Sequence, residues 1–282
     1  MIQPLSFIHP EAQVAKNVIV DPFSTIDKNV VIGEGTWIGP NVTIMEGARI
    51  GKQCKIFPGA VISAVPQDLK FDGEDSLAII GDNTTIRECV TINRGTSSNG
   101  ETKIGNNTTI RECVTINRGT STNGETKIGN NCLIMAYSHI AHDCIIGDYC
   151  ILSNNSTLAG HIKIGNYVVL SGLTAIHQFC SIGDYAFISG GSKVRKDVPP
   201  FVKAAKEPLS FIGVNSIGLN RNGFSSEKVQ EIQNIYRILF QQNNNISQAI
   251  PIIEAEIKAT KERDDILQFV LNSKRGLMKG YN

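Results

Sequence analysis

Four of the five histidines, with one adjacent aspartate, are the residues whose type and spacing best fit catalytic chemistry. His139, His142, His161 and His177 lie in one stretch of the chain, and Asp143 directly follows His142. Imidazole titrates near neutral pH and serves in proton transfer or as a metal ligand. A carboxylate can orient an imidazole, but adjacent residues of a strand point to opposite faces. The pair therefore predicts a general base at His142 if the backbone turns a corner there.

The elements that must position these histidines follow from a six-residue rhythm of aliphatic side chains. Every sixth residue is aliphatic from Ile8 to Ile62, and the rhythm resumes from Ile128 to Val194. A period of six fits neither an α-helix nor a simple strand, and it is typical of a hexapeptide parallel β-helix with three hexapeptides per turn. A β-sandwich, the alternative, would not hold its alternation in phase for so long. We therefore predict an all-β fold over residues 1–200, a left-handed parallel β-helix of hexapeptide repeats.

The same period predicts which turns of the solenoid the histidines occupy. His142 and His161 are 19 residues apart, and His161 and His177 are 16 apart, each close to one 18-residue turn. This spacing predicts that the three side chains lie on successive turns of one wall, separated by about 4.8 Å per turn along the axis.

Metal binding is the alternative use of these histidines. The γ-class carbonic anhydrases are solenoid enzymes whose zinc ligands include two histidines four residues apart, and that pair is absent here. His139 and His142 are three apart in a region of strands and corners, where their side chains do not point the same way. We therefore expect no metal.

Small residues at fixed places complete the hexapeptide pattern. The position four residues after each inward aliphatic is small or β-branched, and five of the seven cysteines fall there, where Cys acts as a small buried hydrophobe. No CxxC pair is present, which argues against a zinc knuckle or redox motif. Glycines after inward aliphatics are expected to allow unusual corner angles. The cysteines are Cys54, Cys132, Cys144, Cys150 and Cys180, and the glycines are Gly33, Gly39, Gly51, Gly147, Gly165 and Gly183.

Two segments depart from the rhythm. Residues 64–76 form an expected loop thrown out from the coils, and long loops in compact domains are usually functional. The periodicity ends at residues 196–200, and from Ser225, a plausible N-cap, apolar residues take helical spacing. Further helices are expected near 247–260 and 262–273. We therefore predict that residues 201–282 form a small α-helical domain.

Composition limits the partners. The net charge is +1, which gives no electrostatic footprint for nucleic acid or a polybasic membrane anchor. The first residues lack the basic and apolar regions of a secretion signal, and no apolar run approaches membrane-spanning length. We expect a cytoplasmic protein with no nucleic-acid partner and no stable membrane insertion.

A tandem duplication lies in the middle of the predicted solenoid. Residues 83–106 are repeated at once as residues 107–130, with only Ser98 replaced by Thr122. The repeat of 24 residues equals one 18-residue turn plus six, and the six are expected to bulge as loops over 94–100 and 118–124. Because 24 is a multiple of six, the inward register survives the insertion.

Several motifs, in their order along the chain, resemble those of the acyl-carrier-protein-dependent UDP-N-acetylglucosamine O-acyltransferases, which catalyse the first step of lipid A synthesis. The resemblance covers essentially the whole chain apart from one duplicated copy, and it implies a homotrimer with active sites between subunits. It also implies no cofactor, because the acyl chain arrives on the phosphopantetheine of acyl carrier protein. The motifs are Pro66-Gln-Asp-Leu-Lys70, Asn93-Arg-Gly-Thr96, Ile140-Ala-His-Asp-Cys144, Leu158-Ala-Gly-His161, Ala175-Ile-His-Gln-Phe-Cys180 and Asp197-Val-Pro-Pro200.

The resemblance assigns roles residue by residue. His142 matches the base that takes the proton from the sugar 3-hydroxyl as it attacks a 3-hydroxyacyl thioester, Asp143 matches its assistant, and the Gly160 N–H matches the oxyanion donor. Gly190 matches a residue that limits acyl-chain depth. The remaining substrate-binding candidates are Gln67, Asp68 and Lys70 on a loop that reaches a neighbouring subunit's site, His139, His161, His177 and Gln178 near the sugar and acyl chain, and Asn215 and Arg221 near the nucleotide.

Two departures from the family pattern bear on activity. Asn222 stands where the family usually carries a second arginine for the nucleotide phosphates, and a lost cation weakens phosphate binding. The duplication falls between Lys70 and His142, so an added turn would separate two parts of one site by about 4.8 Å. We therefore expect the fold to survive and the activity to be weakened or lost.

Two other functions remain open at this point. One is another nucleotide-sugar N-acyltransferase of the hexapeptide class, although such enzymes often carry an extra domain before the coils, which here begin at Ile8. The other is a non-catalytic scaffold built as a lengthened solenoid.

Overall fold

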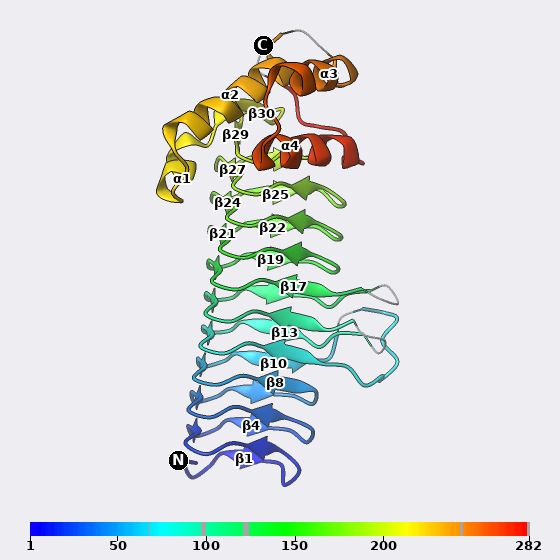
Figure 1. Cartoon of the computed structure of the whole chain (residues 1–282). Coiled ribbons are helices and arrows are strands. Elements are labelled where there is room, and N and C mark those ends of the chain that lie inside the picture. Colours follow the sequence, from blue (N-terminus) through cyan, green and yellow to red (C-terminus); the bar gives the residue numbers. More distant parts are fainter. Residues whose placement is uncertain (67, 97–99, 121–123, 243–244, 281–282) are drawn as a thin grey trace.

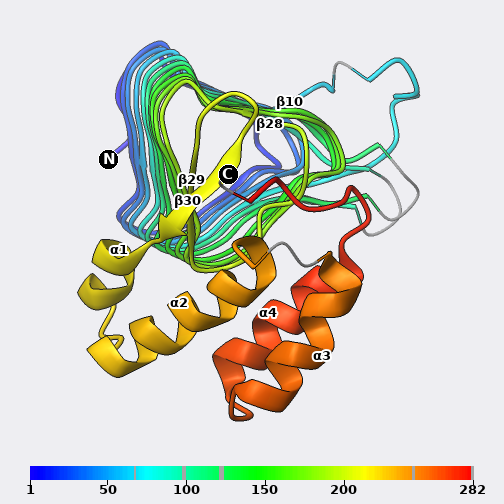
Figure 2. The same cartoon turned by 90° about the horizontal axis from the view of Figure 1, so that it is seen from above.

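The computed structural model is a triangular solenoid with a helical cap at its C-terminal end (Figure 1). It describes residues 1–282 except 67, 97–99, 121–123, 243–244 and 281–282. Figure 2 views the tube along its axis, with its walls stacked turn upon turn and the helices beside one edge. The predicted left-handed β-helix is confirmed.

Three sheets form the walls, and within them strands pair in parallel with their counterparts on the next turn, except the last strand of the third sheet, which is antiparallel. The first wall holds β1 (Phe7–Ile8), β4 (Thr25–Ile26), β7 (Thr43–Ile44), β10 (Val61–Ala64), β13 (Thr91–Asn93), β16 (Thr115–Ile116), β19 (His139–Ile140), β22 (Thr157–Leu158), β25 (Ala175–Ile176) and β28 (Lys193–Val194). The second holds β2 (Gln13–Val14), β5 (Val31–Ile32), β8 (Ala48–Ile50), β11 (Ala78–Ile80), β14 (Thr102–Ile104), β17 (Thr126–Ile128), β20 (Ile145–Ile146), β23 (Lys163–Ile164) and β26 (Ser181–Ile182). The third holds β3 (Ile19–Val20), β6 (Trp37–Ile38), β9 (Lys55–Ile56), β12 (Thr85–Ile86), β15 (Thr109–Ile110), β18 (Leu133–Ile134), β21 (Ile151–Leu152), β24 (Val169–Leu170), β27 (Phe187–Ile188), β29 (Val202–Ala205) and β30 (Ser210–Val214).

The aliphatic residue of each hexapeptide fills the tube. From Val20 to Val194 these side chains are buried, and the five cysteines predicted at the small inward position are buried with them. Burial raises the pKa of the Cys144 thiol to about 12. Such a thiol stays protonated and serves as packing.

The glycines after the inward aliphatics have a different role from the expected one. None of Gly33, Gly39, Gly51, Gly147, Gly165 and Gly183 has a positive φ; other corner residues take the left-handed conformation. A Cβ on Gly33 would instead lie 2.6 Å from the carbonyl carbon of Gly51, one turn above. These residues are glycine because successive turns approach too closely for a side chain.

The duplication adds one complete turn. Thr91 of the first copy pairs with Thr115 of the second, which pairs in turn with His139. The same order holds in the other two walls, where β12, β15 and β18 follow one another, as do β14, β17 and β20. The extra residues of each copy lie between the first and second walls, as predicted, although the loop tips at 97–99 and 121–123 fall outside the described residues.

The predicted α-helical domain over residues 201–282 begins with two strands and becomes helical at Ser216. β29 first extends the third wall in parallel with β27, and β30 then turns back antiparallel on β29. The helices follow as α1 (Ser216–Arg221), α2 (Ser226–Phe240), α3 (Ile246–Glu256) and α4 (Lys261–Asn272). Ser225 caps α2 as predicted, whereas α1 was missed and α3 ends before residue 260. The cap is fastened to the solenoid by Tyr236, which is fully buried and donates its hydroxyl to the Pro200 carbonyl at 2.6 Å.

The added turn yields a prediction about deletions. Removing residues 107–130 places Thr91 directly below His139 and keeps every inward position, so this variant should unfold within about 5 °C of the full chain, because solenoid stability is set by nearest-neighbour contacts. Removing residues 107–127 is the matched control, since it moves Asn131 and Tyr137 into inward positions and should prevent folding. Thermal unfolding followed by circular dichroism measures both. Equal stability of the two deletions would contradict the register argument.

Candidate functional site

A cavity of about 370 Å³ lies where the long loop, the duplicated turns and the His142 corner meet. Its lining residues are Asp68, Asn93, Asn117, Arg118, Thr120 and His142. The volume falls within the range of small-molecule sites. Asp68 and His142 therefore line the same space, although the added turn was expected to separate the loop from His142 by about 4.8 Å.

The chain turns a corner after β19, and this corner brings the His142 and Asp143 side chains together as predicted. Asp143 adopts a left-handed backbone conformation with φ of 60°, so the two adjacent side chains turn to the same side. The Nδ1 atom of His142 lies 2.7 Å from Oδ2 of Asp143. The exposed fractions of the two side chains are 39% for His142 and 5% for Asp143, so the imidazole faces solvent while the carboxylate is enclosed.

The next turn of the same corner packs on this pair. The His142 and His161 rings meet edge to face with centroids 5.0 Å apart, as their 19-residue spacing predicted for neighbouring turns. The His161 Nε2 atom lies 3.6 Å from Asp143 Oδ2. A Cβ on Gly160 would lie 2.4 Å from Cε1 of His142. Any side chain at residue 160 would therefore displace the imidazole.

Thr120 completes the surroundings of Asp143. Its hydroxyl donates to Asp143 Oδ2 at 2.8 Å, and its backbone N–H lies 3.1 Å from Oδ1 and 3.2 Å from Oδ2. Burial opposes ionisation of the carboxyl, but the hydrogen bonds from His142 and Thr120 outweigh it and hold the Asp143 pKa below its usual range. An ionised carboxylate can only accept, so Nδ1 of His142 carries the proton and Nε2 keeps a free lone pair.

Arg118 joins the long loop to this corner. Its side chain is 4% exposed and forms ion pairs with Asp68 at 3.1 Å and with Glu74. Burial raises the pKa of Asp68, but the Lys70 backbone N–H and the Arg118 guanidinium together bring it below its usual range. Lys70 itself is exposed, and Gln67 lies outside the described residues.

His139 lies on β19, on the wall just before the corner that carries His142. Its Nδ1 atom is 2.7 Å from the Thr115 hydroxyl of the turn below. The imidazole is half-buried, and burial lowers the pKa of His139 because it disfavours the charged ring. His139 is therefore suited to accept or donate a hydrogen bond as a neutral group.

Other predicted residues lie away from the cavity in this single chain. His177 lies one turn above His161, but two positions earlier in that turn. Its Nδ1 atom therefore lies 3.2 Å from the Arg275 guanidinium and does not join the His142 and His161 rings. Gln178 occupies the position of His142 two turns higher. Gly190 packs on Gly172 at the opposite end of the first wall's strands, where a Cβ would approach the Gly172 carbonyl oxygen at 3.1 Å.

The candidates for nucleotide contact lie on the short helix α1. Asn215 caps this helix and also donates to the Tyr185 carbonyl at 2.9 Å. Arg221 is the last residue of α1 and is exposed. Asn222, at the place of the expected arginine, folds back onto the helix and donates to the Gly218 carbonyl at 2.8 Å. Its amide is thus used as a C-terminal cap.

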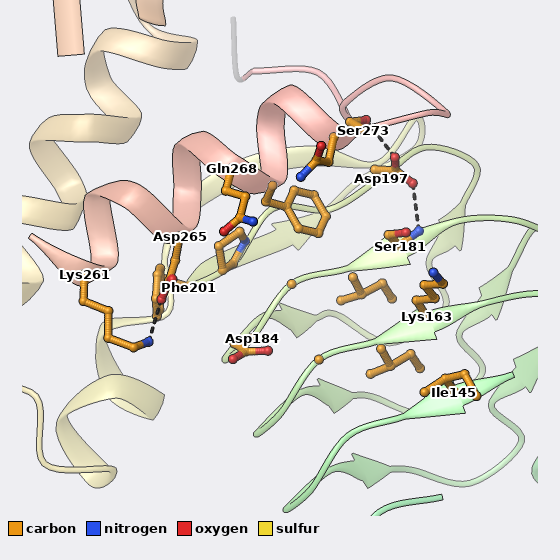
Figure 3. Close-up of a pocket in the computed structure, with 17 residues that line it drawn as sticks. Ile145, Lys163, Ser181, Asp184, Asp197, Phe201, Lys261, Asp265, Gln268 and Ser273 are labelled. Carbon is orange, nitrogen blue, oxygen red and sulfur yellow. Dashed lines mark hydrogen bonds and ion pairs between the residues drawn. The ribbon is translucent and has the colours of Figure 1, made fainter. Parts of the chain in front are cut away.

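A second cavity, of about 480 Å³, lies between α4 and the second wall (Figure 3). Asp197 holds its rim together by accepting from the Ser181 N–H and the Ser273 hydroxyl, each at 2.7 Å. None of the site residues expected from the sequence lines this cavity. We interpret it as the seam between cap and solenoid.

The ligand atoms of His142, Asp143 and His161 lie within 4.8 Å of one another, which is close enough to consider a divalent cation. Tetrahedral zinc with bonds near 2.0–2.1 Å holds its ligand atoms about 3.3 Å apart. The 2.7 Å between His142 Nδ1 and Asp143 Oδ2 is shorter than that and fits a hydrogen bond. The geometry therefore favours a base and its carboxylate over a metal centre.

Sequence reasoning missed Arg118 and Thr120. The motif Asn93-Arg-Gly-Thr96 was noted in the first copy, but its role, and the choice between the copies, was not assigned. The signal was present as the repeated Asn-Arg-Gly-Thr at 117–120, directly below the His142 turn in the added coil.

The chain is similar to known proteins over nearly its whole length. The family profile described as "Udp N-acetylglucosamine O-acyltransferase; Domain 2" matches residues 197–278, and a bacterial transferase hexapeptide profile matches 29–64 and 125–160. An acyl-(acyl-carrier-protein)–UDP-N-acetylglucosamine O-acyltransferase of Sulfurihydrogenibium is 51% identical over 98% of this chain and 93% of its own. The Trichlorobacter lovleyi protein of the same name is 47% identical over 99% of both. The crystal structure of a UDP-N-acetylglucosamine acyltransferase from Bacteroides fragilis is similar with a TM-score of 0.80, 45% identity, and 99% and 100% coverage of the two chains.

The burial of His139 predicts a pH dependence of stability. Between the ordinary histidine pKa, about 6.5, and the lower value in the folded protein, the unfolded chain binds more protons than the folded one. The free energy of unfolding should therefore fall as the pH drops from about 7 to 5. Urea unfolding at several pH values should show a shallower fall for His139→Gln. Parallel curves for the two proteins would show that His139 does not cause the loss.

Proposed function

The chain belongs to the acyl-carrier-protein-dependent UDP-N-acetylglucosamine O-acyltransferases, and from this we propose that His142 is its general base, assisted by Asp143. The observation that carries the proposal is the 2.7 Å contact between His142 Nδ1 and the buried Asp143 carboxylate. It leaves the Nε2 lone pair available on an accessible ring, and His142 lines a cavity of about 370 Å³. The enzyme transfers an acyl chain from acyl carrier protein to UDP-N-acetylglucosamine, and we propose a 3-hydroxyacyl chain and the sugar 3-hydroxyl, as the start of lipid A synthesis.

In the proposed reaction His142 takes up one proton from the sugar hydroxyl and then gives it to the leaving thiolate. His142 Nε2 takes the proton of the sugar 3-hydroxyl as the oxygen attacks the thioester carbonyl carbon. Asp143 stays ionised and stabilises the imidazolium that forms. The tetrahedral intermediate then expels the phosphopantetheine thiolate, which takes the proton from His142. The base is thereby restored, and no redox or metal step is needed.

Gly160 fits the role of oxyanion donor because its backbone lies against the base. A Cβ there would lie 2.6 Å from Nε2 of His142, so a larger residue would displace the imidazole. A backbone N–H aimed at the developing oxyanion strengthens its hydrogen bond as charge forms. His161, Gln178 and His139 stand nearby on the same wall and edge, where they would contact the sugar and the first part of the acyl chain.

The active assembly is proposed to be a homotrimer. One corner of the solenoid carries exposed apolar side chains on several of its turns, with Phe23, Tyr137 and Leu173 exposed to 60%, 62% and 67%. A closed ring of identical chains would cover these side chains. In that assembly the exposed Lys70, with Gln67, would reach toward a neighbouring subunit, while Asp68 of the same loop lines the cavity of its own chain. Gly190, Asn215 and Arg221 would line the rest of the cleft.

Further proposals concern delivery and place of work. The acyl chain is expected on the phosphopantetheine of acyl carrier protein, with no other cofactor, and the reaction is expected in the cytoplasm. Within the described residues, none of the helices has the length and apolar character to cross a membrane.

The duplicated turn is proposed to weaken the reaction without abolishing it. The long loop leaves the solenoid at β10, and in the first wall β13 and β16 now separate β10 from the β19 turn. Arg118 keeps Asp68 at the cavity, whereas Lys70 is exposed. A displacement of about 1 Å in a reacting group costs on the order of 100-fold in rate, so the stretched loop should place the substrate poorly.

Replacing the base tests the assignment. His142→Ala should lower kcat by about 100-fold or more, because general-base catalysis contributes about that much. The fold should be unaffected, since the ring is 39% exposed. Steady-state turnover with a hydroxyacyl carrier protein measures the effect, and His9→Ala on the distant first turn is the control. Unchanged acyl transfer in His142→Ala would remove the general-base assignment.

Deleting one copy tests the effect of the duplication. The variant lacking residues 107–130 should turn over at least about tenfold faster than the full chain, because it shortens the span between the loop and His142 by one turn, about 4.8 Å. The same carrier-protein assay compares the two proteins at equal concentration. Equal turnover would show that the added turn has no effect on catalysis.

A further inference from the structure

The two copies of the duplicated segment are nearly identical in sequence but have different neighbours. The turn above the first copy is the second copy, whereas the turn above the second copy carries His139, His142 and Asp143. In a solenoid each side chain lies beside its counterpart on the adjacent turn. Identical residues in the two copies therefore meet different groups, and the copies need not share a role.

Threonines of the second copy hydrogen-bond to residues of the site through their hydroxyl groups, and Thr120 does so through its backbone N–H as well. The Thr115 hydroxyl lies 2.7 Å from His139 Nδ1, and the Thr120 hydroxyl donates to Asp143 Oδ2 at 2.8 Å. The oxygen that accepts from Thr120 is the one that contacts His142 Nδ1. Thr120 thus holds the same carboxylate oxygen that contacts the imidazole.

The first copy makes neither bond. Thr91, the counterpart of Thr115, pairs with Thr115 itself. Thr96, the counterpart of Thr120, hydrogen-bonds through its hydroxyl to the Gly100 carbonyl of its own loop at 3.2 Å. The chemistry of the two threonines is the same, and only the second has a carboxylate above it.

The arginines of the two copies differ in the same way. Arg118 holds Asp68 and Glu74 through ion pairs, whereas in the described residues the buried Nε of Arg94 has no hydrogen-bond partner. Both guanidinium groups lie near the Phe71 ring, at 5.1 Å for Arg94 and 5.3 Å for Arg118. The loop therefore spans both copies, but its carboxylates are paired with the second.

We propose that Thr120 is a positioning residue that holds Asp143 against His142, and that Thr96 of the other copy has no part in the reaction. The second copy is then the turn that builds the site, and the first is a spacer. This proposal rests on the assignment of His142 and Asp143 as base and assistant. It adds a third residue to that pair and assigns the working copy.

Matched single substitutions test the proposal in the full chain. Thr120→Val keeps the shape and removes the hydroxyl, so kcat should fall about tenfold or more while KM for UDP-N-acetylglucosamine stays within about twofold. Thr120→Ser should restore most of the turnover, and Thr96→Val should equal the parent. A Thr120→Val enzyme with parental kcat would overturn the proposal, as would equal losses in Thr120→Val and Thr96→Val.

Single-copy chains provide a second test through an exchange of roles. In the variant lacking residues 107–130 the first copy lies directly below His139, so Thr96 takes the place of Thr120. Thr96→Val, silent in the full chain, should now lower kcat about tenfold or more. If it stays silent there, the positioning role is wrong even though turnover is present. If neither the full chain nor the single-copy chain transfers an acyl group, the acyltransferase function fails instead.

Discussion

The backbone hydrogen bonds between successive turns are the interaction on which the rest of the structure depends. They place each residue directly above its counterpart one turn earlier, as with Phe7 and Thr25, or Thr115 and His139. Strand spacing of about 4.8 Å leaves little room between turns, which is why Gly33 lies under Gly51 and Gly160 lies against the His142 ring. Residues of the core, the corners and the site therefore stack in columns along the axis. The residues directly above and below a side chain in its column decide which contacts it makes.

This constraint also explains why a long insertion is tolerated. A segment that completes whole hexapeptides returns the chain to the same inward phase, and one that closes a full turn returns it to the same wall. The duplicated charges even find partners across the new interface, since Lys103 of the first copy pairs with Glu101 of its own copy and with Glu125 of the second. Contacts between neighbouring turns accommodate the insertion. Groups that must act together from opposite sides of the insertion are moved apart by it.

The sequence predicts the repeated parts of this molecule well and the irregular parts poorly. The six-residue period sets the inward residues, the walls and the contact between His142 and His161, because each depends only on position in the repeat. The C-terminal strands β29 and β30 were missed because they extend a sheet that already exists, so tertiary pairing rather than local pattern decides them. Arg118 and Thr120 were missed because choosing between identical copies requires the order of the turns.

The site illustrates how much a neighbour contributes to a residue's chemistry. Asp143 is an effective partner for His142 because it is buried yet ionised, and it stays ionised because Thr120 and His142 both donate to it. Without such donors, burial would raise its pKa and weaken its hold on the imidazole. Thr120, on the turn below, therefore supplies part of the electrostatic environment of His142 by stabilising the ionised Asp143. In a chain with two almost identical turns, the one next to the base is the one whose hydroxyl reaches the carboxylate, so a site residue is defined here by its place in the stack as much as by its side chain.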